Sequence, residues 1–166
     1  VQERAATEAA EAWESTPEFS DMRRLGFIRD VFREALRLYP PVPMMVREAR
    51  QEETFRKRKV RPGSMCILSP WHIQRHERIW DRPHVFDPDR WQTPETRATA
   101  REAYMPFSTG PRVCTGAGFA MIEGVILLAL LLRAYKFEPV KGKVPVPVQH
   151  LTVRSESGIW LKLTPR

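Results

Sequence analysis

The stretch that decides the fold runs Phe107-Ser108-Thr109-Gly110-Pro111-Arg112-Val113-Cys114-Thr115-Gly116, and it sets a cysteine between two glycines, just before a long apolar segment. Glycine can adopt positive φ angles and lets the backbone come close to a flat ligand. Free N–H groups at the beginning of the following helix favour a negative charge, which stabilises a thiolate over a thiol. Arg112 adds a positive charge and could bind a ligand carboxylate. A small buried cysteine at a helix start is the common alternative, and the loop alone leaves it open.

A second motif, Glu34-Ala35-Leu36-Arg37-Leu38-Tyr39-Pro40-Pro41, lies upstream. Glu34 and Arg37 are three residues apart on a predicted helix, and the two prolines end that helix because proline cannot continue its hydrogen bonds. An exposed pair of this kind contributes only about 0.2–0.5 kcal/mol and occurs in most helices. A later segment, Pro88-Asp89-Arg90-Trp91, contains a further arginine that bears on the role of this pair.

Together these motifs resemble the cytochrome P450 family. The cysteine loop matches the family's heme-binding loop at four positions around Cys114, from seven residues before it to two after it: Phe107, Gly110, Arg112 and Gly116. Phe119-Ala120 and Glu123 resemble the start of the helix that follows that loop. The resemblance implies that Cys114 is the catalytic thiolate ligand of the heme iron and that the four loop residues bind the cofactor.

The resemblance also implies a buried structural triad. In the family, a Glu-x-x-Arg pair such as Glu34 and Arg37 is joined by an arginine from a later segment, which here is Arg90. Asp89 and Trp91 replace the more usual Glu and Phe. Buried charges persist only when they are paired and hydrogen-bonded, so we expect the triad to fix the proline-rich stretch beneath the heme without reacting.

Two further assignments follow from the resemblance. Arg47 resembles the arginine that often binds a heme propionate, with a surface strand arginine as the alternative. Pro43, Met44 and Met45 fall where the family's extended segment lines the substrate pocket, with ordinary core packing as the alternative.

The pattern predicts an α+β fold with about three main helices, small β-hairpins and a long proline-rich irregular segment at 81–110. The predicted helices cover residues 1–14, 21–39 and 116–135, with a short one at 71–80. The predicted strands are an extended segment at 42–46, a hairpin of 54–60 with 64–68, and a final hairpin of 151–154 with 159–163. The last long helix should be buried on most sides.

The resemblance covers residues 1–166 as the C-terminal heme-binding portion of a larger single-domain protein. It begins at the helix before the Glu-x-x-Arg helix. The N-terminal part would supply the central helix over the heme and most of the substrate pocket. Without it, the apolar helix at 116–135 would be exposed, so we expect the isolated chain to self-associate.

The net charge and the pattern of basic residues limit the classes of binding partner that we expect. The chain has 27 Lys and Arg against 20 Asp and Glu, a formal net charge of +7, with one short cluster at Arg56-Lys57-Arg58-Lys59. No zinc-finger spacing, aromatic RNA-binding signature or heptad accompanies the basic residues, so we expect no nucleic-acid partner. The charge could serve solubility or the docking of an acidic electron donor of ferredoxin, flavodoxin or reductase type, with Arg97 and Arg101 as candidate contacts.

The cysteines and histidines argue for a reducing compartment and no separate metal site. Cys66 and Cys114 give no disulfide framework. His72 and His76 are four residues apart, but no third ligand joins them. No signal-like segment is visible, and the longest apolar run, 124–132, is too short to cross a bilayer. We expect a cytoplasmic location, while an anchor before Val1 stays open.

The resemblance implies a heme-thiolate monooxygenase that uses heme b. It would insert one oxygen atom from O2 into a small, hydrophobic organic substrate, with electrons from a partner protein. The alternative is a heme-binding fragment or interaction module with no catalytic activity of its own.

Overall fold

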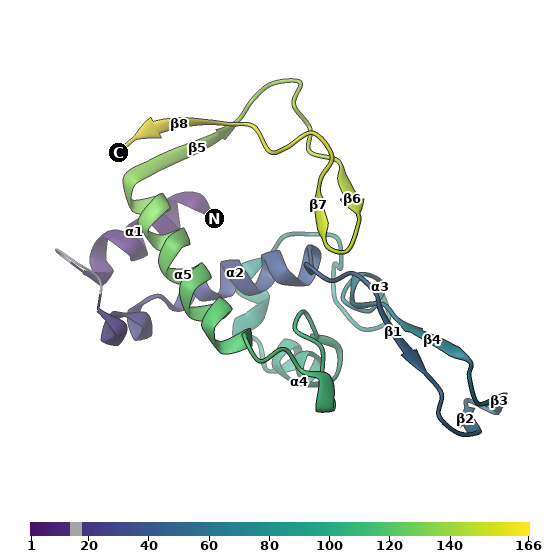
Figure 1. Cartoon of the computed structure of the whole chain (residues 1–166). Helices are drawn as coiled ribbons and strands as arrows, with labels where there is room; N and C mark the ends of the chain where they lie inside the picture. Colours follow the sequence, from purple (N-terminus) through teal and green to yellow (C-terminus); the bar gives the residue numbers. More distant parts are fainter. Residues whose placement is uncertain (14–17) are drawn as a thin grey trace.

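The computed structural model describes residues 1–13 and 18–166, and it is built around three helices (Figure 1). These are α1 (Gln2–Ala12), α2 (Gly26–Leu38) and α5 (Ala117–Ala134). Their buried residues form one core: Ala5, Ala6, Ala9, Ala12, Trp13, Leu25, Phe27, Ile28, Val31, Val125, Ala129 and Leu132. The alanines of α1 let neighbouring helices approach closely. The end of the first predicted helix, at Glu14, and the first residues of the connector lie outside the described residues.

The packing of α5 on α2 is close at one point. A Cβ atom added to Gly124 would lie 2.3 Å from the ring of Phe32. The two helices therefore approach where glycine leaves room for an aromatic side chain. α2 is also joined to α1, because the Glu8 carboxylate accepts hydrogen bonds from the N–H groups of Phe27 and Ile28, each at 2.8 Å. This carboxylate caps the beginning of α2 in the absence of a local side-chain cap.

The predicted helix at 21–39 is interrupted. A 3₁₀ helix, η1 (Phe19–Arg24), precedes α2, and Leu25 has non-helical φ and ψ angles between them. The guanidinium of Arg24 donates to the carbonyls of Glu11 and Ala12, and so binds the last turn of α1. The prediction missed this break because the contact joins residues that are twelve or more positions apart.

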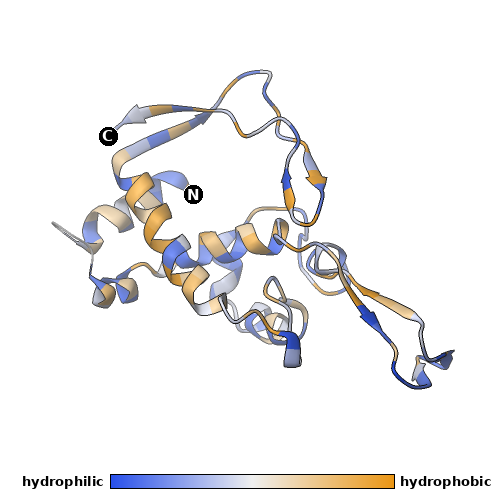
Figure 2. Ribbon diagram, in the orientation of Figure 1, coloured by the Kyte–Doolittle hydropathy of each residue, from blue (hydrophilic) through white to orange (hydrophobic). Residues whose placement is uncertain are grey.

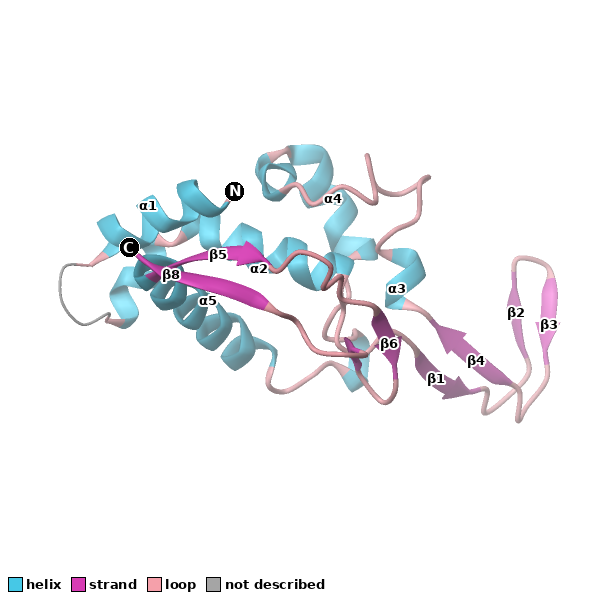
Figure 3. Ribbon diagram, turned by 90° about the horizontal axis from the view of Figure 1, so that it is seen from above, coloured by secondary structure: helices cyan, strands magenta, loops and turns pink. Residues whose placement is uncertain are grey.

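Eight strands form four separate antiparallel pairs among the described residues. The first two pairs are β1 (Met45–Glu48) with β4 (Met65–Leu68) and β2 (Glu53–Phe55) with β3 (Arg58–Val60). The other two are β5 (Tyr135–Pro139) with β8 (Leu161–Pro165) and β6 (Pro147–Gln149) with β7 (Val153–Ser155). The first two pairs form an arm that extends away from the helices, with β2 and β3 at its far end (Figures 1 and 3).

Both predicted hairpins are wrong in their pairing. The chain turns between β2 and β3 at Arg56 and Lys57, whose φ angles are 44° and 69°. Two successive positive φ angles are typical of a tight hairpin turn, usually built from Asn or Gly. Arg and Lys therefore provide no sequence signal for this turn. The segment at 64–68 pairs with β1, and Gly63 (φ 80°) belongs to the connection between the two pairs. At the C-terminus, the predicted partners at 151–154 and 159–163 instead pair with β6 and β5.

The proline-rich stretch at 81–110 is more regular than predicted. It contains a 3₁₀ helix, η2 (Pro88–Gln92), and α4 (Pro94–Ala103), while α3 (Pro70–Ile73) covers only the start of the helix predicted at 71–80. The Thr93 hydroxyl caps α4 by accepting from the N–H of Thr96, with Pro94 in the first turn. The helix escaped prediction because α4 buries only Ala103 and so lacks apolar periodicity.

α5 is exposed over most of its surface, contrary to the prediction that it is buried on most sides. Its buried residues are Val125, Ala129 and Leu132, whereas Phe119 is 69% exposed. Figure 2 shows apolar residues along its length. By length and composition, α5 is the one helix in the described part of the chain that could cross a membrane, although the apolar run within it was judged too short. Core helices of soluble proteins can have the same length and composition.

Candidate heme-thiolate site

The predicted ligand, Cys114, lies in a loop between a short 3₁₀ helix, η3 (Gly110–Arg112), and α5. Its N–H donates to the carbonyl of Phe107 at 2.8 Å, and its own carbonyl accepts from Ala117 at 3.3 Å. The thiol is free and exposed. The common alternative of a small buried cysteine therefore does not describe this residue.

The two glycines of the loop have different tasks. Gly110 has a φ of 69°, which a residue with a side chain adopts only with strain. Gly116 has a φ of −86° and is the N-cap of α5, so it needs no positive φ angle. A Cβ atom there would lie 3.8 Å from the sulfur of Cys114, which places the sulfur beside the beginning of α5. That end carries the positive partial charge of the helix.

Arg47 reaches the cysteine loop from the arm. It lies on β1, opposite Cys66 of β4, and its guanidinium is 3.5 Å from the hydroxyl of Ser108. Arg112 is exposed within the same loop. The structure thus brings the guanidinium of Arg47 from β1 to the loop that carries both Cys114 and Arg112. An arrangement of this kind can hold the carboxylates of a flat ligand.

The predicted triad residues come together in a buried cluster. The side chains of Glu34, Arg37 and Arg90 are 0%, 0% and 4% exposed. The Glu34 carboxylate accepts from Arg37 through Nε at 2.9 Å and Nη2 at 2.8 Å, and from Nε of Arg90 at 3.0 Å. It also accepts from the indole N–H of Trp91 at 3.2 Å and from the backbone N–H of Asp87 at 3.0 Å. Five donors therefore surround one buried carboxylate.

The remaining N–H groups of the two arginines bind backbone carbonyls at Gln74 and at the beginning of the proline-rich stretch. Arg37 donates to the carbonyls of Gln74, Pro83 and Val85. Arg90 donates to the carbonyls of Asp81, Arg82 and Val85. The cluster thus holds a segment with little secondary structure of its own.

Two members of this cluster were not identified from the sequence. Trp91, noted only as a departure from the family pattern, donates to Glu34. Gln74 is fully buried, donates to the carbonyls of Leu36 and Arg37, and accepts from the N–H of Met105 at 2.7 Å. No local pattern marks Gln74, because it stands at the end of a four-residue helix.

The predicted substrate-lining residues are only partly brought together. Pro43 and Met44 line a cavity of about 190 Å³, together with Val148 and Val153 of the β6–β7 pair. The N–H of Val153 donates to the carbonyl of Pro41 at 2.8 Å and joins that pair to this segment. Met45 does not line the cavity; it begins β1 opposite Leu68. The contribution of β6 and β7 was missed because their pairing was mispredicted.

The histidines are engaged locally. Nδ1 of His72 is 2.8 Å from the hydroxyl of Ser69, and Nδ1 of His76 accepts from the N–H of Arg78 at 3.1 Å. Among residues 1–13 and 18–166, no group of three His, Cys, Asp or Glu side chains is placed to hold a metal ion.

Comparison with known proteins defines the class to which this fold and loop belong. The family model described as Cytochrome P450 matches residues 1–163, so the chain belongs to the cytochrome P450 family. This confirms the resemblance carried by the motifs, and membership of the family implies a heme cofactor.

Individual relatives agree. Cytochrome P450 4B1 of Rattus norvegicus is 36% identical over 149 residues, which make up 89% of this chain and 29% of the relative. Cyclooctatin synthase of Streptomyces melanosporofaciens is 35% identical over 138 residues, or 82% of this chain and 30% of the relative. The crystal structure of the cytochrome P450DA heme domain superposes with a TM-score of 0.89 at 30% identity, covering 99% of this chain and 37% of that one. The α+β fold class is thereby confirmed, and the chain spans about a third of the length of these proteins.

The residues present suit a heme. A free thiol is a ligand that iron accepts, and Cys114 presents one without a disulfide partner. Val113 and Phe119, on either side of it, are 52% and 69% exposed and offer apolar surface to a flat ring. Arg47 supplies a cation at the same loop.

Proposed function

We propose that this chain is the C-terminal, heme-binding portion of a heme-thiolate monooxygenase that inserts one atom of O2 into a small, hydrophobic organic substrate. The observation that carries the proposal is the exposed, free thiol of Cys114, held beside the beginning of α5 by its N–H bond to Phe107. Family membership supports the reaction class.

In this proposal Cys114 ligates the iron of heme b, and Arg47 and Arg112 bind its propionate groups. The turn at Gly110 lets the loop backbone approach the ring, while Phe107 and Gly116 hold and border the cysteine. When bound, the heme supplies oxygen activation, and a thiolate ligand favours O–O cleavage by donating electron density.

The other named residues have supporting tasks. Arg37 and Arg90 donate to carbonyls at 81–85, and Glu34 accepts from the N–H of Asp87 and the indole of Trp91. The three residues thereby fix the stretch at 81–91 and position the chain that leads to the cysteine loop. Pro43 and Met44 line the path of the substrate, while Met45 begins β1. The electron donor is a protein of ferredoxin, flavodoxin or reductase type, and this chain lies in the cytoplasm with Cys66 reduced.

The exposed face of α5 favours a second candidate function. Its residues Leu127 and Leu131, on neighbouring turns, are 52% and 47% exposed, which leaves apolar side chains open to solvent. In that candidate the chain is a heme-binding fragment that self-associates through α5 and has no catalytic activity of its own.

The test is the absorption difference spectrum of the reduced protein with and without carbon monoxide. We expect the full-length protein to show a strongly red-shifted Soret band that is lost in Cys114→Ala and kept in Cys66→Ala, the matched control. If Cys114→Ala keeps the band, the assignment of the ligand is wrong.

The same measurement on the isolated chain with added heme separates the two candidates. A red-shifted Soret band from the isolated chain, with no substrate turnover when a redox partner is added, supports the fragment candidate. A band and turnover that both require the full-length protein support the monooxygenase portion.

A further inference from the structure

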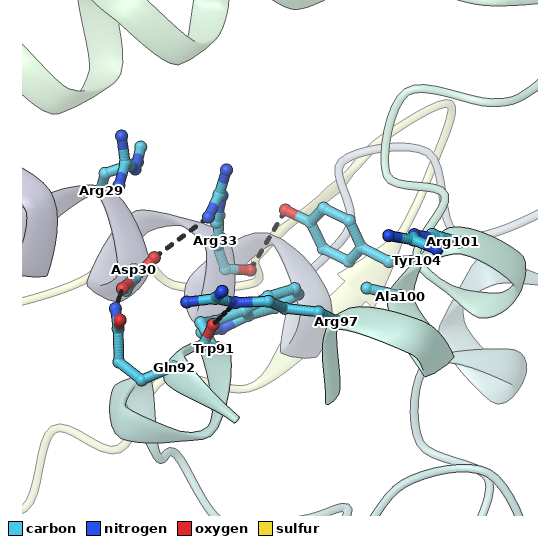
Figure 4. A pocket seen from close by; sticks show the side chains of 9 residues that line it. All are labelled: Arg29, Asp30, Arg33, Trp91, Gln92, Arg97, Ala100, Arg101 and Tyr104. Atoms are coloured by element: carbon cyan, nitrogen blue, oxygen red, sulfur yellow. Dashed lines mark hydrogen bonds and ion pairs between the residues drawn. The ribbon is translucent and has the colours of Figure 1, made fainter. Parts of the chain in front are cut away.

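A second polar site lies between α2 and α4, outside the cysteine loop (Figure 4). It is an open pocket of about 470 Å³, with Arg29 and Arg33 from α2 and Arg97 and Arg101 from α4 among its lining residues. Among residues 1–13 and 18–166, Asp30 is the one acidic residue that lines it. We propose that this pocket binds a multiply charged, phosphate-bearing anion.

The first argument is the unbalanced charge. Asp30 is 1% exposed, and its carboxylate already accepts from Arg33 at 3.1 Å and from the side-chain amide of Gln92. Arg29 and Arg101 form no ion pair with any residue of the described chain. The pocket is therefore lined by four guanidinium groups and one engaged carboxylate, and it has a net positive charge that an anion can satisfy.

The second argument is that part of the site is held in place. Asp30 fixes the guanidinium of Arg33, and Nε of Arg97 donates to the carbonyl of Trp91 at 3.3 Å. The hydroxyl of Tyr104 donates to the carbonyl of Arg33 at 3.3 Å, and burial raises the pKa of Tyr104, so the phenol stays neutral. A site whose cations are already positioned loses less entropy when a ligand binds.

The third argument is the surroundings of the charges. Trp91 is 5% exposed, and its ring meets that of Tyr104 at a centroid distance of 4.7 Å, which gives the pocket an apolar floor. Clefts lined by one sign of charge, with walls of low dielectric, concentrate the field at the ligand. The attraction for an anion is therefore stronger here than at scattered surface arginines.

The number of arginines favours phosphate over an isolated carboxylate. Each guanidinium fork can donate two hydrogen bonds to one anion, and a phosphate group offers more acceptor oxygens than a carboxylate does. The positive end of α2 does not contribute to anion binding, because the N–H groups of Phe27 and Ile28 there already donate to the Glu8 carboxylate. The volume is in the range of small-molecule sites and exceeds what one acidic side chain would fill.

The experiment titrates pyrophosphate into the full-length protein at low ionic strength and follows the heat of binding. The test variant is Arg29→Gln with Arg101→Gln. The matched control is Arg58→Gln with Arg61→Gln, which removes the same charge from exposed positions on and beside β3. We expect saturable binding that weakens by about tenfold or more in the test variant, since two charge-assisted interactions are lost, and by less than about twofold in the control.

Three results would overturn the proposal: no saturable binding, equal weakening in the test and control variants, or binding of a polyglutamate peptide at the same arginines without binding of pyrophosphate. The last result would assign Arg97, Arg101 and their neighbours to an acidic protein partner. Parallel titration with ADP identifies the source of the phosphate, because tighter binding than pyrophosphate indicates a nucleotide. Cys114→Ala should bind pyrophosphate unchanged, so this test is independent of the heme assignment.

Discussion

Replacing Glu34 by glutamine tests the buried cluster most directly. The carboxylate accepts five hydrogen bonds, from Arg37, Arg90, Trp91 and the backbone of Asp87, and it is fully buried. An amide of the same shape keeps one oxygen but turns an NH2 group toward donors. Two buried arginines then lose their only anionic partner within the described residues.

The expected loss follows from the cost of an unpaired buried charge. Removing one partner of a buried ion pair costs about 3–5 kcal/mol, a large part of the 5–15 kcal/mol that stabilises a typical domain. The matched control is Glu52→Gln, which breaks the exposed pair of Glu52 with Lys59. Exposed pairs contribute at most about 1 kcal/mol, so the control should change little.

The assay is urea unfolding of the full-length protein, followed by tryptophan fluorescence, with the free energy of unfolding compared between the two variants. We expect Glu34→Gln to lose several kcal/mol or to yield no folded protein, while Glu52→Gln folds normally. Glu34→Asp, which restores the charge with a shorter side chain, should recover part of the loss. A loss below about 1 kcal/mol in Glu34→Gln would refute the reasoning.

Three more predictions test separate contacts by the same unfolding assay. Trp91→Phe, which restores the side chain usual in the family, should cost about 1.5–3 kcal/mol, since it removes a hydrogen bond to a buried carboxylate; an unchanged stability would show that the indole N–H is not needed. Gly124→Ala should destabilise the protein by about 1–3 kcal/mol through overpacking. The control Gly118→Ala, with open space around it, should stabilise the protein by up to about 1 kcal/mol. Equal effects of the two substitutions would contradict the close packing of α5 on α2. Burial raises the pKa of Tyr104 above its ordinary value of 10, so the free energy of unfolding should fall as pH rises above about 10. Tyr104→Phe should make this dependence on pH less steep, whereas Tyr135→Phe should not.

The sequence predicted the parts of the fold that local signals define. Pro40 and Pro41 end α2 at Leu38, as expected from the missing hydrogen-bond donor. The apolar run that begins after Gly116 is a helix, within one or two residues of the predicted bounds. The meeting of Glu34, Arg37 and Arg90 was instead implied by the family resemblance, and the ion pairs of Glu34 with both arginines are present.

The parts that failed depend on contacts between distant segments. Strand pairing was misjudged because the turn at Arg56 and Lys57 uses two positive φ angles at residues that rarely adopt them. The exposure of α5 could not be predicted from its composition. An apolar helix needs a partner surface, but its composition does not show whether that surface belongs to this chain. Gln74 has no sequence signature, because its importance comes from accepting the N–H of Met105, thirty-one positions later.

The same contacts explain how the cysteine loop is held although few of its residues are buried. Just before it, the hydroxyl of Tyr104 binds the carbonyl of Arg33 on α2, and the N–H of Met105 binds Gln74, whose amide donates to the last turn of α2. Just after it, α5 packs on α2 at Gly124. Both ends of the loop are therefore fixed to one helix, so the thiol is positioned by its anchors and by the bond from its N–H to Phe107. The buried charges of α2 thus act on the proposed heme ligand through the position of the chain, which is why a change in the cluster should alter the site without touching it.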